Sequence, residues 1–442
     1  MNAREASVLG QLLEYRAVLL LQGPNGPFFA RLRDALELAG VRVCKLNFNG
    51  GDDLFYRKGH VEHFVSPMTA LEPCLRDLLA REAIDAVVVF GATRRPHRIA
   101  TRLARELGID VWAFEEGYFR PDYITLERGG VNADSPLAAL TVDEIPQTGP
   151  VACRRRFPHA FRSMAWYSLC YFAAGMIAGR RYPRYRHHKP FGLHEAAAWL
   201  RAAWRKPLYR RRERPLVRAL LGAEHPPFFL VALQVRSDSQ IRVHSPWRRN
   251  EDFLAWVMCS FAAHAPPDTM LVVKHHPLDR GHADYRQAID TLAARFGLAG
   301  RVVYVHDAHL PSLLQACDGL VTVNSTTGLQ ALHHRAPVIV LGRCFYDKPG
   351  LTTQGSLDAF WTRPGAVDLA TYRRFRQYVI RTSQVNGSFY GNGGLLPWPE
   401  KAGAGWLRQV RLGLWVALLA LVASARTPGW GLGALAGWMA QW

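Results

Sequence analysis

Polar side chains that could bind a phosphate gather in residues 322–328, whose sequence is TVNSTTG. The apolar run 319–323 predicts a buried strand, and the LQAL sequence after the polar turn predicts a helix. A helix start leaves backbone N–H groups unpaired and carries the positive end of the helix dipole. The sequence therefore predicts an anion site of the kind that holds a phosphate. Its side-chain donors would be Asn324, Ser325, Thr326 and Thr327.

A second polar cluster follows another expected strand, in the sequence KHHPLD. Lys274, His275 and His276 can together neutralise a phosphate or a carboxylate, and Pro277 would fix the turn. A single histidine is more often a satisfied core residue, but a lysine and two histidines at one strand end favour a binding site. Two polar strand ends in one half of an α/β chain indicate a nucleotide-type ligand.

A third strand end in the same half carries the sequence LQVRSDSQI. Gln234 could recognise a base or hold the loop, and Asp238 could orient a ribose or cap a helix. The candidate ligand-binding residues of this segment are Gln234, Asp238, Ser239 and Gln240.

Two adjacent carboxylates, Glu115 and Glu116, follow a strand in the first half of the chain and precede Arg120. Burial of both is costly unless they are paired or used. One interpretation is a salt bridge to Arg120, and the other is a catalytic carboxylate that acts as base or nucleophile. Successive residues of an extended segment point to opposite sides, so we expect only one of the two acids to face the ligand.

The sequence QGPNGPFF, residues 22–29, places glycines at the end of the first expected strand. It is neither a G-x-G-x-x-G pattern nor a P-loop, which would need a lysine. An ordinary strand–helix turn explains it without any function. The functional interpretation is an acceptor-side or interlobe loop in which Gly23, Asn25 and Gly26 contact substrate.

These motifs require a frame of alternating strands and helices. The apolar runs predict an α/β fold of GT-B type, with two Rossmann-like lobes that face an interlobe cleft. Strands are expected at residues 17–21, 41–43, 85–90, 110–114, 226–233, 269–274, 301–305, 319–323 and 337–341. The expected parts are an N-terminal lobe at 1–220 with a basic, apolar helical segment at about 140–220, a second lobe at 221–365, and crossover helices with an apolar tail at 366–442.

The composition predicts an anionic partner. The 442 residues include 55 Lys+Arg against 36 Asp+Glu, a formal net charge of +19. This excess fits anionic lipid, a charged substrate or nucleic acid. The seven cysteines are scattered without zinc-ligand spacing, which indicates reduced thiols in a cytoplasm and no structural metal. The polar N-terminus does not resemble a secretory signal.

Two apolar segments flanked by arginines, residues 164–178 and 412–425, fall short of the roughly 20 residues that span a bilayer. Such segments can lie in the headgroup region of an acidic membrane, which would make the protein peripheral. The alternative is a buried core helix with a solvated basic flank. Because the arginines accompany apolar helices and not a stacking sheet, nucleic acid is not expected as a partner.

Six segments in this order resemble the capsule polysaccharide biosynthesis family, in particular its KpsS/LipB-type β-Kdo transferases. They are QGPNGPFF, NFNGGD, FEEGYFRPDYITLE, LQVRSDSQI, KHHPLDRG and NSTTGLQAL. The resemblance implies a retaining GT-B glycosyltransferase at the cytoplasmic face of the inner membrane. It would use CMP-Kdo, start the poly-Kdo linker on (lyso)phosphatidylglycerol, and work with other capsule biosynthesis and export proteins. A non-catalytic scaffold of the same assembly is the alternative.

The resemblance also implies roles for individual residues. Glu116 stands where related transferases have the catalytic second acid of an E-D-G-F-type motif, with Glu in place of Asp. His276 and Pro277 match the family's H-P motif, which is implicated in binding the CMP phosphate. The family's Ser/Thr motif falls on Asn324, Ser325 and Thr326, and its Q…DSQ motif falls on Gln234 and Asp238 to Gln240.

The expected chemistry agrees with these roles. CMP is a good leaving group, so positive charge and N–H donors suffice and no general acid is required. The Kdo carboxylate suits Arg120 or Lys274. No Asp-x-Asp metal motif occurs at these sites, and we expect no metal cofactor.

Overall fold

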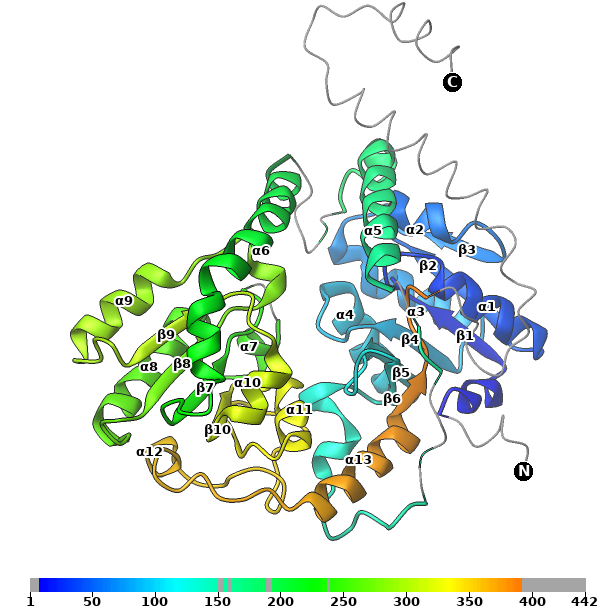
Figure 1. Cartoon of the computed structure of the whole chain (residues 1–442). Helices are drawn as coiled ribbons and strands as arrows, with labels where there is room; N and C mark the ends of the chain where they lie inside the picture. The colour runs from blue at the N-terminus through cyan, green and yellow to red at the C-terminus, as the bar shows by residue number, and fades with distance from the viewer. Residues whose placement is uncertain are drawn as a thin grey trace, which may run out of the picture.

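The chain folds into two α/β lobes, which the computed structural model shows side by side (Figure 1). The structure describes residues 8–149, 151, 155–157, 160–185, 187, 193–236 and 239–391. Short 3-10 helices lie at Gly10–Glu14, Met68–Ala70, Asn132–Asp134, Pro136–Ala139, Ala178–Arg180 and Pro277–Asp279.

The first lobe, blue to cyan in Figure 1, is built on a seven-stranded sheet with the order β12-β6-β5-β4-β1-β2-β3. β1 to β5 pair in parallel, whereas β6 runs antiparallel to β5. The strands β1, β4 and β5 are nearly continuous apolar runs because helices cover the sheet. The strands are β1 (Ala17–Leu20), β2 (Arg42–Asn47), β3 (His60–His63), β4 (Ala86–Phe90), β5 (Asp110–Glu116) and β6 (Tyr123–Arg128). The helices are α1 (Phe28–Leu38), α2 (Gly50–Phe55), α3 (Leu71–Arg81) and α4 (Arg95–Glu106).

The second lobe, green to yellow, contains a parallel five-stranded sheet with the order β11-β10-β7-β8-β9. Its strands are β7 (Phe228–Ala232), β8 (Met270–Lys274), β9 (Val302–Val305), β10 (Gly319–Thr322) and β11 (Val338–Val340). Its helices are α7 (Ser239–His244), α8 (Asn250–His264), α9 (Arg286–Arg295), α10 (Leu310–Ala316), α11 (Thr327–His333) and α12 (Leu357–Phe360).

A last helix, α13 (Leu369–Ser383), runs back from the second lobe to the first (Figure 1, orange). Asp368 caps its start by accepting from the backbone N–H groups of Ala370 and Thr371. The short strand β12 (Gln384–Asn386) then pairs antiparallel with β6. This arrangement confirms the expected α/β fold of GT-B type. The sequence did not predict β3, β6 or β12.

Two helices connect the lobes. α5 (Ala160–Ile177) packs on α2, where a Cβ on Gly50 would lie 2.4 Å from the carbonyl oxygen of Ala174. α6 (Leu193–Leu220) contacts the second lobe, because the Nη1 atom of Arg201 donates to the carbonyl oxygen of Gly281 at 3.1 Å. The range expected to belong to the first lobe thus contributes a helix to the second. The boundary at residue 220 stays a prediction.

Residues 164–178, one of the two expected membrane segments, fall within α5 and its C-terminal end. Within the described residues, no helix is both long and apolar enough to cross a membrane. The other segment, residues 412–425, lies outside the described residues.

Candidate active site

The polar strand ends of the second lobe meet at its topological switch point. β7 lies between β8 and β10: the chain adds β8 and β9 on one side of β7 and then crosses back to add β10 and β11 on the other. Ligands of open α/β sheets bind at this place. The Nε2 atom of Gln234, after β7, donates to the Oδ1 atom of Asn324, after β10, at 2.9 Å. The structure thus brings together two of the predicted binding residues.

Lys274 and His276 lie at the neighbouring end of β8. Lys274 is only 6% exposed, and burial lowers its pKa to about 8. The pKa of His276 is lowered to about 4, first by burial and then by the positive charges of Arg120 and Lys274. The Nδ1 atom of His276 accepts from the backbone N–H of Leu278 at 3.2 Å, so the neutral ring carries its proton on Nε2. His276 is therefore a neutral hydrogen-bond donor at physiological pH.

Arg120 comes from the first lobe, and its charge acts on His276 of the second. It is exposed and donates from Nε to the carbonyl oxygen of Gly117 at 3.3 Å. Arg120, His276 and Lys274 thus form one electropositive group made by both lobes. This group is suited to a phosphate or a carboxylate.

His275 occupies a different environment. Its side chain is 0% exposed, and its Nδ1 atom lies 2.6 Å from the hydroxyl of Tyr304. Burial lowers its pKa to about 3, so the ring is neutral. Because the ring lies inside the second lobe, it has no open path to a ligand in this structure.

Several hydrogen-bond donors of the turn after β10 bond to acceptors within the same turn. The backbone N–H of Thr327 donates to the Oγ atom of Ser325 at 3.2 Å, and that of Gly328 donates to the carbonyl oxygen of Ser325 at 3.0 Å. The Oγ atoms of Ser325 and Thr327 are 3.0 Å apart, and Thr326 caps α11 without a side-chain bond. The expected strand, turn and helix are present, but α11 has only seven residues.

The third predicted segment is only partly described. Ser239 and Gln240 begin α7, and Asp238 lies outside the described residues. Pro277 is the first residue of the short 3-10 helix after His276, as expected for a proline that fixes a turn.

The paired acids end strand β5 on the first lobe. The Oε1 atom of Glu115 accepts from the backbone N–H of Glu116 at 3.0 Å. Burial raises the pKa of Glu115 to about 7, and the negative charge of Glu116 adds to this, against the positive charges of Arg120 and Arg94. Glu115 is therefore partly protonated near neutral pH. No carboxylate–guanidinium ion pair to Arg120 is found within the described residues, contrary to the salt-bridge interpretation.

The turn after the two acids is stabilised by hydrogen bonds from residues that the sequence analysis did not identify. The Oε1 atom of Gln384 accepts from the backbone N–H of Tyr118 at 2.9 Å, and its Nε2 atom donates to the hydroxyl of Thr125 at 3.0 Å. The hydroxyl of Tyr118 donates to the carboxyl group of buried Glu127 at 2.9 Å. Gln384 lies over 260 positions along the chain from Tyr118, so no local pattern could identify it.

Arg94 is a second residue that the sequence did not single out. It follows β4, and its Nη1 atom donates to the Oε1 atom of Gln22 at 3.1 Å and to the carbonyl oxygen of Gly23 at 3.5 Å. Its charge acts on Glu115. The signal for it was the polar stretch that follows an apolar strand, the same signal as at the other strand ends.

The glycine-rich loop after β1 packs beneath α5. The Nδ2 atom of Asn25 donates to the hydroxyl of Ser168 at 3.3 Å. Gly26 has a φ of 143°, and a Cβ there would lie 3.0 Å from the ring of Tyr167. The conformation of this loop is therefore fixed by its contact with α5.

Comparison with known proteins identifies the family. Residues 85–390 match the family described as capsule polysaccharide biosynthesis protein. The chain belongs to this family. It is 41% identical to the capsule polysaccharide modification protein LipB of Neisseria meningitidis serogroup B over 382 residues, 84% of this chain and 91% of the relative. It is 39% identical to the capsule polysaccharide export protein KpsS of Escherichia coli over 389 residues, 87% of this chain and 100% of the relative.

Solved structures of similar fold include two from Thermosulfurimonas dismutans KpsC. Its β-Kdo 2,7 transferase has a TM-score of 0.37 at 16% identity, covering 75% of this chain and 85% of the other. Its β-Kdo 2,4 transferase has a TM-score of 0.39 at 16% identity, covering 82% and 90%. These values are too low to support a functional argument.

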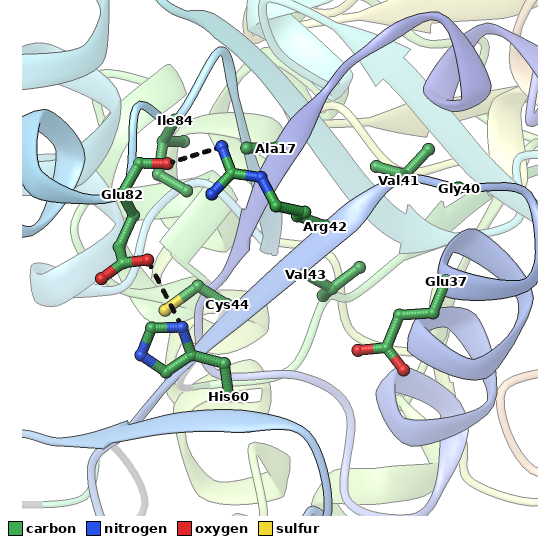
Figure 2. Close-up of a pocket in the computed structure, with 10 residues that line it drawn as sticks. All are labelled: Ala17, Glu37, Gly40, Val41, Arg42, Val43, Cys44, His60, Glu82 and Ile84. Carbon is green, nitrogen blue, oxygen red and sulfur yellow. Dashed lines mark hydrogen bonds and ion pairs between the residues drawn. The ribbon is translucent and has the colours of Figure 1, made fainter.

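This member of the capsule polysaccharide biosynthesis family also has a pocket away from the acids (Figure 2). The pocket, about 370 Å³ in volume, lies at the amino ends of β1 and β2, the opposite edge of the sheet from Glu115. In it, the Nδ1 atom of His60 lies 3.4 Å from the carboxylate of Glu82, and burial raises the pKa of Cys44 to about 12. A thiol with such a pKa is not a nucleophile at neutral pH, so we assign the pocket no chemistry.

Proposed function

We propose that the protein is a retaining glycosyltransferase that moves Kdo from CMP-Kdo to a (lyso)phosphatidylglycerol acceptor and so starts the poly-Kdo linker of a capsular polysaccharide. The observation that carries this proposal is the electropositive group made by both lobes, with Arg120 beside His276 and Lys274. Arg120 belongs to the same turn as Glu115 and Glu116. An anion held at this group would therefore have a carboxylate from the first lobe nearby.

The donor would bind between the lobes. Lys274 neutralises the phosphate of CMP, the Nε2–H group of the neutral His276 donates a hydrogen bond to it, and Arg120 pairs with the carboxylate of Kdo. The pair formed by Gln234 and Asn324 lies at the switch point, where a nucleoside would sit. Positive charge on the departing phosphate stabilises the transition state without a proton transfer. The transfer should therefore need no metal, and activity should survive EDTA.

The reaction would proceed in two displacements. The carboxylate of Glu116 attacks the anomeric carbon, and the bond from that carbon to the CMP phosphate oxygen breaks with its electron pair going to CMP. An acceptor hydroxyl then attacks the same carbon, and the glycosyl ester bond breaks to restore the carboxylate. We expected only one of the two acids to face the ligand, but the carboxyl group of Glu115 turns back to the backbone N–H of Glu116, so we propose that both act. Glu115 receives the hydroxyl proton, which suits a carboxyl group with a pKa of about 7.

The acceptor would be reached from an anionic membrane surface, together with other capsule biosynthesis and export proteins. α5 and α6 extend to the same side of the molecule in Figure 1, and the rings of Phe172 and Trp199 lie 6.5 Å apart between them. Large apolar side chains are exposed on both helices, including Phe161 at 70% and Trp204 at 71%. Exposed arginines accompany them. Aromatic and basic side chains together favour the headgroup region of an acidic leaflet, and we place the protein at the cytoplasmic face of the inner membrane.

Activity with defined substrates tests the proposal. The purified full chain, supplied with CMP-Kdo and lysophosphatidylglycerol, should yield a Kdo-lipid by mass spectrometry and should discriminate against other nucleotide sugars. Glu116→Gln should abolish turnover while leaving the thermal unfolding midpoint unchanged. A wild-type protein that binds the membrane but transfers no sugar would indicate the scaffold role instead.

Sedimentation with vesicles tests the membrane surface. Trp204→Ser should reduce binding to vesicles that contain phosphatidylglycerol. Leu38→Ser is the matched control, because Leu38 is 72% exposed on α1, away from α5 and α6. Equal loss in both variants would contradict a specific role for α6.

A further inference from the structure

The first lobe has a switch point of its own. β1 lies between β2 and β4 in its sheet: the chain adds β2 and β3 on one side of β1 and then crosses back to add β4 and β5 on the other. Gln22 follows β1 and Arg94 follows β4, and the two are joined by a hydrogen bond of 3.1 Å. The geometry matches that of Gln234 and Asn324 in the second lobe. Each lobe therefore places a hydrogen-bonded pair of polar side chains where α/β sheets bind ligands.

Arg94 has binding capacity to spare. A guanidinium has five N–H donors, and only its Nη1 atom bonds to protein groups among the described residues, both of them uncharged oxygens. No carboxylate of the described chain lies within ion-pair distance of it. Its cationic face rests on the ring of Phe90, with 5.2 Å from the guanidinium carbon to the ring centroid. This stacking orients the donors without using them.

Asp52, a buried acid that contacts Gln22, does not pair with Arg94. Asp52 is 5% exposed and accepts from the hydroxyl of Tyr171 at 2.9 Å, the backbone N–H of Phe48 at 2.9 Å and the side chain of Gln22 at 3.4 Å. Its oxygens are therefore satisfied by neutral donors. Gln22 also lies 2.8 Å from the hydroxyl of Tyr185. The polar groups around Gln22 are thus the hydroxyls of Tyr171 and Tyr185, the carboxylate of Asp52 and the one cationic side chain of Arg94.

α5 lies between these polar groups and an apolar outer surface. Its inner face carries Tyr171, which hydrogen-bonds Gln22 at 2.9 Å. Its outer face exposes Leu169 at 43% and Met176 at 49%. Polar groups inside the lobe and apolar groups on its surface thus lie on opposite faces of one helix. The diameter of a helix, about 10–12 Å, is the upper limit of the distance between them.

We propose that Arg94, which buried Gln22 holds in position, binds the phosphodiester headgroup of the lipid acceptor, with α5 supporting the acyl part. This inference rests on the proposed function, because it assigns the acceptor subsite of the same reaction. Arg94 also acts electrostatically on Glu115, so a headgroup held here lies beside the acids that would act on its hydroxyl. A planar guanidinium binds a phosphate through two parallel hydrogen bonds.

Direct binding without any donor sugar tests this subsite. Two probes are titrated into the full chain and followed by calorimetry: dihexanoyl phosphatidylglycerol below its micelle concentration, and glycerol 3-phosphate. Arg94→Gln should weaken binding of the lipid roughly 10- to 100-fold, the loss expected for a charge-assisted hydrogen bond. Arg98→Gln is the control, because Arg98 is an exposed arginine one turn further on, in the helix α4 that Arg94 precedes. An unchanged lipid affinity in Arg94→Gln would overturn the proposal, as would a wild-type protein that binds neither probe.

The two probes separate the possible sources of the phosphate. Tighter binding of the lipid than of glycerol 3-phosphate supports a lipid headgroup, whereas equal affinities overturn the role given to α5. CMP affinity should be equal in wild-type and Arg94→Gln, which shows that the variant is folded. Because no CMP-Kdo is present, the result is independent of turnover. Loss of lipid binding in Arg94→Gln would support the subsite even if no sugar transfer were found.

Discussion

The rings of Tyr118 and Phe345 stack across the two lobes, with centroids 4.3 Å apart and planes inclined by 29°. Tyr118 lies two residues after Glu116, and Phe345 lies in the loop after β11. Phe345 also stacks on Phe375 of α13 at 6.2 Å. The position of the acids relative to the second lobe is therefore set by an aromatic contact and not by a flexible linker.

Phe345→Ala should remove this contact. We expect a loss of about 3 to 5 kcal/mol in unfolding free energy, because a fully buried ring leaves a cavity. The rate of sugar transfer should fall more than the affinity for CMP, because CMP would contact only the second lobe whereas transfer needs residues of both lobes. Urea unfolding and calorimetric titration with CMP measure the two effects. Phe345→Leu, which retains most of the volume, should lose much less; an equal loss in both would show that the aromatic ring, and not the volume it fills, stabilises this contact.

Gly117 makes the turn after the acids possible. A Cβ at this position would lie 1.9 Å from the carbonyl oxygen of Tyr123, a backbone atom that cannot rotate away. Gly117→Ala should therefore separate β5 from β6 and displace Glu116. We expect lost activity and a lower thermal unfolding midpoint.

Gly108→Ala is the matched control for that variant. Gly108 has a φ of 69°, so alanine there is strained, but nothing lies within 4 Å of its Cβ. The free energy of unfolding of Gly108→Ala should fall by about 1 kcal/mol because of the backbone strain alone, and the variant should keep full activity. An active Gly117→Ala protein would contradict the tight-turn argument.

The strands of the two sheets could be predicted where an apolar run is followed by a polar turn. The strands Ala17–Leu20 and Gly319–Thr322 are apolar runs bounded by polar turns, and such runs predict parallel strands without tertiary knowledge. The strand Tyr123–Arg128 was missed because it ends in charged residues. Its Glu127 is buried only because Tyr118 and Ser135 hydrogen-bond to it, contacts that no sequence pattern encodes.

The site was predictable as a set of strand ends but not as a set of contacts. The two histidines after β8 are adjacent in sequence, yet one lies in the core against Tyr304 and the other beside Arg120. Their environments differ because successive side chains of an extended chain point to opposite sides, one of which is the core of the second lobe. Gln384 and Arg94 became visible only when segments far apart in sequence met in space.

Lys274 should make CMP binding dependent on pH. Its pKa is lowered to about 8, so the free protein is charged at this site below pH 8 and neutral above it. Affinity for the CMP phosphate should therefore fall as the pH rises from 7 to 9.5, although the bound phosphate will raise the pKa and move part of the decline upward. Calorimetric titration over this range measures the effect.

Lys274→Gln should bind CMP roughly 10-fold more weakly at pH 7, with no decline above pH 8. Lys206→Gln, at an exposed position on α6, should behave like the wild type. Near pH 6 the affinity also follows the second ionisation of the CMP phosphate. His276 has a pKa of about 4 and stays neutral there, so His276→Gln should show the same pH dependence as the wild type between pH 5 and pH 7. A pH dependence that differs between the two proteins near pH 6.5 would show that His276 titrates normally and is not buried as described.

The ionisation of Glu115 should make the rate of sugar transfer fall on the acidic side of about pH 7, which gives the pH–rate profile an acidic limb. As proton acceptor it must be ionised, and its pKa is raised to about 7 by burial, so the rate should rise from pH 6 to pH 8. Glu115→Gln should be slower at pH 8 and lose this limb. The same raised pKa makes ionisation unfavourable to folding, so the wild type should lose stability relative to Glu115→Gln as the pH rises from about 4.5 to 7. A rate limb that persists in Glu115→Gln, alongside the expected stability difference, would assign the proton to another group while keeping Glu115 buried.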